Sequence, residues 1–220
     1  MMKIKRKQTK GFASFGDTEI SSLEGTIIAS FFPEGEKMTI KEIGERVNNY
    51  YSYERLNTSL KSLVDKKIAK EEKMGKTLIY SLDLTNLYSQ VMGFSAYMLQ
   101  REIDFINKHK NIYNAIKEIE ANPLIWGVVL FGSYSKDLET KQSDIDIICI
   151  ASRKEEVKQF LDSLKHKYNI NFAPIILPLH EFPNIKEDNP ELWNDLKLYG
   201  IVFKGEDYVY NWMYKDDKGY

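Results

Sequence analysis

Two apolar runs separated by a short polar segment constrain the fold of this chain more than any other feature. The first run, residues 126–131, is interrupted by Gly132-Ser133. Ten residues later Asp144-Ile145-Asp146 opens the second run, residues 147–150. This order predicts a buried strand, a Gly-Ser turn leading into a helix, and a second buried strand that begins with two carboxylates.

The two carboxylates and the turn predict a particular chemistry. In a strand, residues two apart share a face, so Asp144 and Asp146 are expected to point the same way. Two such carboxylates repel each other unless a cation lies between them, and hard oxygen ligands suit Mg²⁺. Glycine lets backbone N–H groups approach a phosphate closely, and the N-terminus of a helix favours its negative charge. Together these features predict a site for a metal-bound nucleotide. The alternative is a structural βαβ unit whose two aspartates only cap a strand.

The spacing of Gly132-Ser133 and Asp144-x-Asp146 resembles the signature of the nucleotidyltransferase superfamily that includes DNA polymerase beta. Within it, the chain is most similar to the minimal nucleotidyltransferases of archaea and bacteria, from about residue 111 to the C-terminus. The resemblance implies a small mixed sheet with flanking helices, a nucleoside triphosphate substrate, with ATP expected, and Mg²⁺ or Mn²⁺. It implies that Asp144 and Asp146 are catalytic and bind the metal. Gly132 and Ser133 would hold the β- and γ-phosphates, and Lys136 would either add charge there or be a solvated surface lysine.

One position departs from the family pattern. Active members usually carry a third carboxylate on the strand after the next helix, and the residue that aligns with it here is Asn171. An amide cannot act as a base and is a weaker metal ligand than a carboxylate. The first acid after that strand is Glu181, beyond Pro178. A glycine that often follows the Gly-Ser turn is also replaced, by Asp137-Leu138. Nucleotide binding is therefore expected, whereas catalysis is in question.

The N-terminal part predicts a separate unit of three helices and a hairpin. The expected helices start near Asp17, after Thr39 and at Ser52, and Thr39 forms a capping box with Glu42. Two strands, residues 68–73 and 77–82, are joined at residues 74–76. This order resembles a winged helix-turn-helix domain. From residue 83 a long helix with an apolar stripe is expected, broken near residues 109–111, and its stripe would serve core packing or homodimerisation.

We therefore expect a two-domain protein that combines α+β and α/β organisation. Its parts are a basic arm (1–16), a winged helix-turn-helix domain (17–85), a linker helix (86–109) and a nucleotidyltransferase domain (110–220). In the last part we expect a helix near residues 112–120, strands over 126–131, 144–151 and 170–177, a helix over 154–167, a final helix over 190–199 and a short closing strand.

Charge leaves DNA binding as an open alternative. The arm carries five basic residues and no acid, but residues 17–85 carry ten basic and twelve acidic residues. Non-specific affinity for DNA comes largely from neutralising phosphates, so this balance argues against it. A local basic face is still expected from four side chains on helix three and the wing: Arg55, Lys61, Lys66 and Lys76. Three functions follow as hypotheses: nucleotidyl transfer, a DNA-binding regulator that only senses nucleotide, and a protein-docking module.

Composition excludes several other classes. No apolar run approaches the roughly 20 residues of a membrane span, and the N-terminus lacks the apolar stretch of a signal peptide. A single cysteine, Cys149, excludes a disulfide framework. The three histidines, His109, His166 and His180, have no metal-binding spacing and are expected on the surface. A cytoplasmic protein without a membrane partner is expected.

Overall fold

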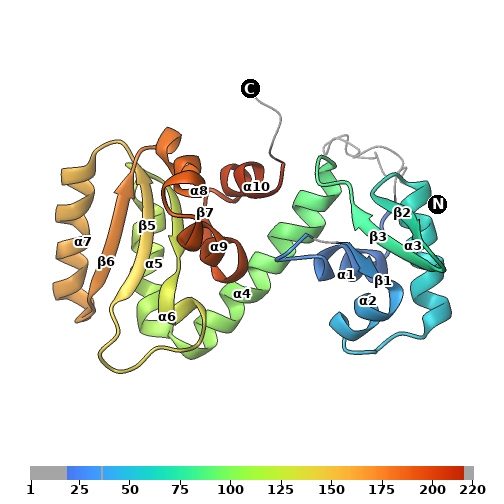
Figure 1. Cartoon of the computed structure of the whole chain (residues 1–220). Coiled ribbons are helices and arrows are strands. Elements are labelled where there is room, and N and C mark those ends of the chain that lie inside the picture. Colours follow the sequence, from blue (N-terminus) through green and yellow to red (C-terminus); the bar gives the residue numbers. More distant parts are fainter. Residues whose placement is uncertain (1–18, 36, 216–220) are drawn as a thin grey trace, which may run out of the picture.

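The computed structural model describes residues 19–35 and 37–215 (Figure 1). The predicted basic arm, residues 1–16, lies outside them. The N-terminal half contains, in order, α1 (Ser22–Ser30), β1 (Met38–Thr39), α2 (Ile40–Arg46), α3 (Tyr53–Asp65), β2 (Ala69–Met74) and β3 (Thr77–Leu82). Its three strands form an antiparallel sheet in the order β1-β3-β2. The three predicted helices and the hairpin are all present, and β1 is an additional short strand.

Local signals explain where these elements begin and turn. Ser21 and Thr39 each form a capping box, with Glu24 and Glu42, at the start of α1 and α2. The Ser52 side chain caps α3 by accepting a hydrogen bond from the Arg55 N–H. The β2–β3 turn contains Gly75 at φ +62°, a conformation that glycine adopts without steric cost.

The middle of the chain is helical but not a single helix. A π-helical segment, η1 (Ser89–Phe94), leads into α4 (Ser95–Lys108), and α5 (Lys110–Ala121) follows. His109 separates α4 from α5 with non-helical dihedrals of φ −130° and ψ 47°. The break was predicted at this place, whereas the π-helical segment was not. No helix within the described parts of the chain has the length and apolarity needed to cross a membrane.

The C-terminal half is built on a four-stranded mixed sheet. Its strands are β4 (Ile125–Leu130), β5 (Ile145–Ala151), β6 (Phe172–Leu177) and β7 (Ile201–Lys204), in the order β6-β5-β4-β7. Only the β5–β6 pair is parallel. The connecting helices are α6 (Gly132–Ser135), α7 (Lys154–Tyr168), η2 (Leu179–Asn184), α8 (Ile185–Asp188), α9 (Pro190–Tyr199) and α10 (Glu206–Tyr214). A small mixed sheet with flanking helices was the predicted arrangement.

The alternating side chains of β5 belong to two separate hydrophobic clusters, one on each side of the sheet. Ile147 and Cys149 pack in the cluster that includes α5 and α7. Ile148 and Ile150 pack in the cluster that includes η2, α9 and α10. Because alternate residues of a strand share a face, Asp146 lies on the side of Ile148, and Asp144 comes immediately before the strand. Asp146 therefore continues the face that α9 and η2 cover.

Helix α10 joins the two halves of the molecule and was missed in the prediction, which made residues 190–199 the final helix. It lies between the C-terminal sheet and the N-terminal half (Figure 1). The Tyr214 hydroxyl donates a 2.6 Å hydrogen bond to the Pro33 carbonyl, and the Tyr210 hydroxyl donates one of 2.7 Å to the Leu84 carbonyl. Both rings also contact Phe32 and Phe94. One hydrophobic cluster thus runs from α1 to the sheet.

Candidate nucleotide site

The Gly-Ser turn and the second aspartate are in direct contact. Gly132 has φ +72°, and a Cβ atom at this position would lie 2.1 Å from Asp146 Oδ2. The Phe131 N–H also donates a 3.0 Å hydrogen bond to the Asp146 carbonyl. Only glycine fits here, because any side chain would displace the carboxylate or the turn. The structure therefore brings together the two halves of the predicted motif, Gly132-Ser133 and Asp146.

The two aspartates differ in their environment. Asp144 is exposed and comes immediately before β5, whereas Asp146 is half-buried within it. Burial raises the pKa of Asp146, and the negative charge of Asp144 raises it further. A cation between the two carboxylates would offset both effects. This arrangement of oxygen donors fits a divalent cation such as Mg²⁺.

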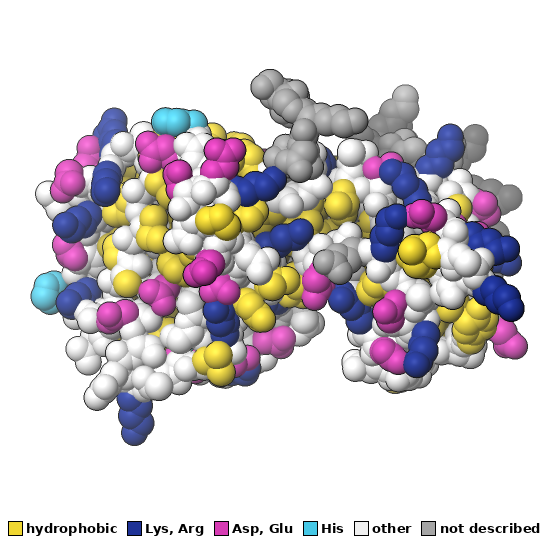
Figure 2. All heavy atoms as spheres, in the orientation of Figure 1, with side chains coloured by type: hydrophobic (Ala, Val, Ile, Leu, Met, Phe, Trp, Pro, Cys, Tyr) yellow, Lys and Arg dark blue, Asp and Glu magenta, His cyan; other side chains and the backbone are white. Residues whose placement is uncertain are grey.

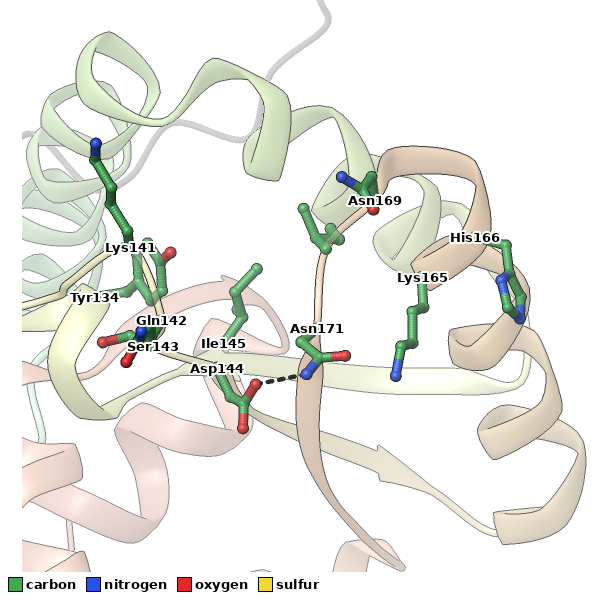
Figure 3. A pocket seen from close by; sticks show the side chains of 11 residues that line it. Tyr134, Lys141, Gln142, Ser143, Asp144, Ile145, Lys165, His166, Asn169 and Asn171 are labelled. Carbon is green, nitrogen blue, oxygen red and sulfur yellow. Dashed lines mark hydrogen bonds between the residues drawn. The ribbon is translucent and has the colours of Figure 1, made fainter.

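Asn171 lies at the site rather than in the core. Ile145 and Phe172 form the first pair of the parallel β5–β6 register. Asp144 and Asn171 each precede one residue of this pair and therefore lie next to each other. The Asn171 Nδ2 donates a 2.8 Å hydrogen bond to Asp144 Oδ1 (Figure 3). The residue opposite Asp146 is Ala173. Neither position on this neighbouring strand therefore offers a third carboxylate.

A cavity of about 580 Å³ opens beside Asp144 and Asn171 (Figure 3). Its walls come from α6 with Tyr134, from the segment before β5 with Lys141, and from the end of α7 with Lys165. The volume lies within the usual range of small-molecule sites. Two lysines on its wall make the cavity suitable for an anionic or strongly polar group.

Lys136, predicted at the triphosphate, is held in an ion pair. Its Nζ lies 2.5 Å from Asp195 Oδ2 on α9 and 5.1 Å from the centre of the Tyr199 ring. Arg101 on α4 binds the same region: its guanidinium donates to the carbonyls of Ser135, at 2.6 Å, and Tyr199, at 2.9 Å. Both cations thus fasten α6 to α9. No local sequence signal marks Arg101, because its partners are 34 and 98 residues away.

The four cations predicted to bind DNA do not form one free basic face. Lys66 is largely buried, and its Nζ lies 2.6 Å from Glu24 Oε1 and 2.7 Å from the Glu19 carbonyl. Arg55 is exposed and lies over the Tyr51 ring, at 5.4 Å from its centre. Lys61 and Lys76 are exposed. In Figure 2 acidic side chains lie among the basic ones over this half.

Comparison with known proteins finds similarity in the C-terminal part. Residues 109–202 match the family described as a nucleotidyltransferase domain, and this segment contains both aspartates and the Gly-Ser turn. The chain is 24% identical over 94 residues to a protein of Methanocaldococcus jannaschii named "Putative protein adenylyltransferase". The aligned part of this chain is 39% of its length, and the alignment covers 63% of that protein. A second protein of that organism with the same descriptive name is 32% identical over 71 residues, 32% of this chain and 57% of the relative. The chain thus spans less than two thirds of either relative.

Proposed function

We propose that the C-terminal part of this protein binds a nucleoside triphosphate with a divalent cation and transfers the nucleoside monophosphate to an acceptor hydroxyl. The hydroxyl oxygen would bond to the α-phosphorus and give up its proton, and the bond to the β-phosphate would break to release pyrophosphate. The contact between Gly132 and Asp146 is the observation that supports the proposal, because it sets the Gly-Ser turn, the candidate phosphate-binding element, beside a carboxylate. The names of the two relatives favour an adenylyl group as the cargo and a protein as the acceptor.

Each element of the site has a role in this proposal. Gly132 and Ser133 would hold the β- and γ-phosphates through backbone N–H groups and the serine hydroxyl. Asp144 and Asp146 would hold the metal, which supplies positive charge at the phosphates. The cavity beside Asp144 would receive either the nucleoside or the acceptor group. Lys136 supports the site indirectly, since its pairing with Asp195 fixes α6 against α9.

Asn171 is the reason to expect slow nucleotidyl transfer. In the family pattern a third carboxylate stands at this position, whereas the amide here donates a hydrogen bond to Asp144. An amide cannot accept the proton of an attacking hydroxyl. We therefore infer that the protein binds nucleotide and transfers the adenylyl group slowly. The proposed activity is that of a weak protein adenylyltransferase.

The proposal is tested with ATP labelled at the α-phosphate, the full-length protein and a cellular extract. Label should become attached to the protein itself or to an extract protein in the presence of Mg²⁺, and transfer should be lost in the Asp144→Asn, Asp146→Asn double variant. The matched control removes two exposed carboxylates elsewhere, Asp162→Asn with Asp188→Asn. Mg²⁺-ATP should raise the melting temperature of the wild type and the control. Equal labelling and equal shifts in both double variants would refute the proposal.

A second function is proposed for the N-terminal half, namely a winged helix that docks duplex DNA or a protein partner. The order of its elements and the strand order β1-β3-β2 support it, together with the exposure of Arg55, Lys61 and Lys76. If DNA is the partner, replacing these three residues with alanine should weaken binding. The slope of log affinity against log salt concentration should become less steep by about one for each phosphate contact that is lost. Absence of duplex binding at low salt would favour a protein partner.

A further inference from the structure

His109 is not the surface residue that its sequence context predicts. Only 14% of its side chain is exposed, because the break between α4 and α5 turns it inward. Its ring packs against Phe105, with centroids 4.9 Å apart, and edge-on against Tyr134 at 5.3 Å. Two aromatic contacts thus hold the imidazole in one orientation.

The imidazole lies beside the half-buried carboxylate of Glu139. His109 Nε2 lies 3.3 Å from Glu139 Oε1, and the Glu139 side chain is 23% exposed. His109 Nε2 and Glu139 Oε2 are both shielded from solvent, and neither makes a hydrogen bond to any residue that the structure describes. A buried polar group left without a partner destabilises a folded protein, so such groups call for an explanation.

A third donor completes the group. Asp137 contributes a carboxylate oxygen, and the three ligand atoms all lie within 4.8 Å of one another. The segment that carries Asp137 and Glu139 is anchored, since the Leu138 N–H donates a 3.0 Å hydrogen bond to the Ser133 carbonyl. Asp137 Oδ2 also accepts a 2.7 Å hydrogen bond from Lys108 Nζ, which offsets part of the negative charge of the cluster.

We propose that His109, Asp137 and Glu139 bind a divalent transition-metal cation, with zinc the best match to the donor set. One imidazole nitrogen with two carboxylate oxygens suits zinc, whereas the oxygen-only pair Asp144 and Asp146 suits Mg²⁺. The two sites would thus be distinct in both place and metal. Zinc here would fasten the segment that follows the Gly-Ser turn to the junction of α4 and α5. The proposal does not depend on nucleotidyl transfer.

The ordinary alternative is an ion pair between protonated His109 and Glu139. The two possibilities differ in their response to metal, because an ion pair needs none and a protonated imidazole cannot ligate one. His180 provides a matched control: its Nε2 lies 3.9 Å from Glu181 Oε1, but both side chains are exposed, at 81% and 54%. This pair has the same chemistry without the aromatic contacts or the third donor.

The experiment titrates chelator-treated full-length protein with zinc chloride at neutral pH, without nucleotide, by calorimetry and by melting temperature. The wild type should bind one equivalent and melt at a higher temperature. His109→Gln and Glu139→Gln should each weaken binding at least tenfold, while His180→Gln should bind as the wild type does. Absence of zinc binding by the wild type, or unchanged affinity in Glu139→Gln, would overturn the proposal. Glu139→Gln keeps the shape of the side chain and removes only its charge. Its zinc affinity therefore decides the question even if His109→Gln does not fold.

Discussion

Asn171 Nδ2 donates a 2.8 Å hydrogen bond to Asp144 Oδ1 across the parallel β5–β6 pair. The amide therefore neutralises none of the charge of Asp144 and supplies no base, although the resemblance to nucleotidyltransferases predicts a third carboxylate at this position. This contact makes Asn171 the residue at which binding and catalysis can be separated experimentally.

Asn171→Asp should accelerate transfer. The new carboxylate adds a metal ligand and a possible base, and general-base assistance is typically worth roughly 10²–10⁴-fold. Labelling from ATP labelled at the α-phosphate should rise accordingly, while nucleotide affinity changes much less. The matched control is Asn169→Asp, on the wall of the same cavity but at the end of α7. Fast wild-type transfer that neither variant alters would show that another residue completes the site.

Gly132→Ala should destabilise the protein more than Gly75→Ala does. Both glycines have positive φ, +72° and +62°, so both substitutions incur a backbone cost of about 1–2 kcal/mol. Nothing lies within 4 Å of a Cβ at position 75, whereas one at position 132 would meet the Asp146 carboxylate. Chemical denaturation should therefore show an additional loss of about 1–3 kcal/mol for Gly132→Ala. The nucleotide-dependent thermal shift should also disappear in that variant alone. Equal losses in the two variants would contradict the contact.

The raised pKa of Asp146 predicts a pH effect with a definite sign. Burial and the charge of Asp144 make the folded protein hold this proton at pH values where the unfolded chain has released it. The carboxyl thus lowers stability as pH rises from its unfolded pKa through its folded pKa. The free energy of unfolding of Asp146→Asn minus that of the wild type should increase over this interval. Mg²⁺ affinity should fall as pH drops through the folded pKa, since protons compete with the metal. A flat difference would mean that Asp146 titrates normally.

Lys66→Met should reduce stability, whereas Lys61→Met should not. Burial raises the pKa of Glu24, but hydrogen bonds from Lys66, Ser21 and Ser62 outweigh this effect and lower the pKa to about 2. Removing Lys66 leaves a buried carboxylate without its cation, which typically costs about 3–5 kcal/mol. Lys61 is exposed on α3, the helix that ends just before Lys66, and serves as the matched control.

This loss should be measured by chemical denaturation at neutral pH and again near pH 3. The stability that Lys66 gives through Glu24 is complete above the unfolded pKa and falls as pH drops towards about 2. The difference between Lys66→Met and the wild type should therefore narrow at the lower pH. Equal stability of the two lysine variants at neutral pH would show that Lys66 is free to contact a ligand.

Local patterns were sufficient to predict most elements of this chain. Thr39 with Glu42, Ser52 and the turn at Gly75 each act within a few residues, so the helix starts and the hairpin can be inferred without tertiary information. The same holds for the break at His109 and for the order strand, Gly-Ser turn, strand. The alternation of β5 also predicts that Asp144 and Asp146 share a face.

Contacts between distant residues were decided only by the tertiary structure. Lys66 forms an ion pair with Glu24, 42 residues away. The sequence had instead placed it on the basic face expected to bind DNA. Tyr214 reaches Pro33, 181 residues away, so that the overlooked α10 joins the two halves. His109 meets Glu139 because the chain turns between α4 and α5 and returns through the Gly-Ser turn. The sequence by itself thus determined the helices, the strands and the motif formed by the Gly-Ser turn and the two aspartates. It could do so because propensity, capping and periodicity are short-range properties. Which charge is paired or buried depends on long-range packing, which no local pattern encodes.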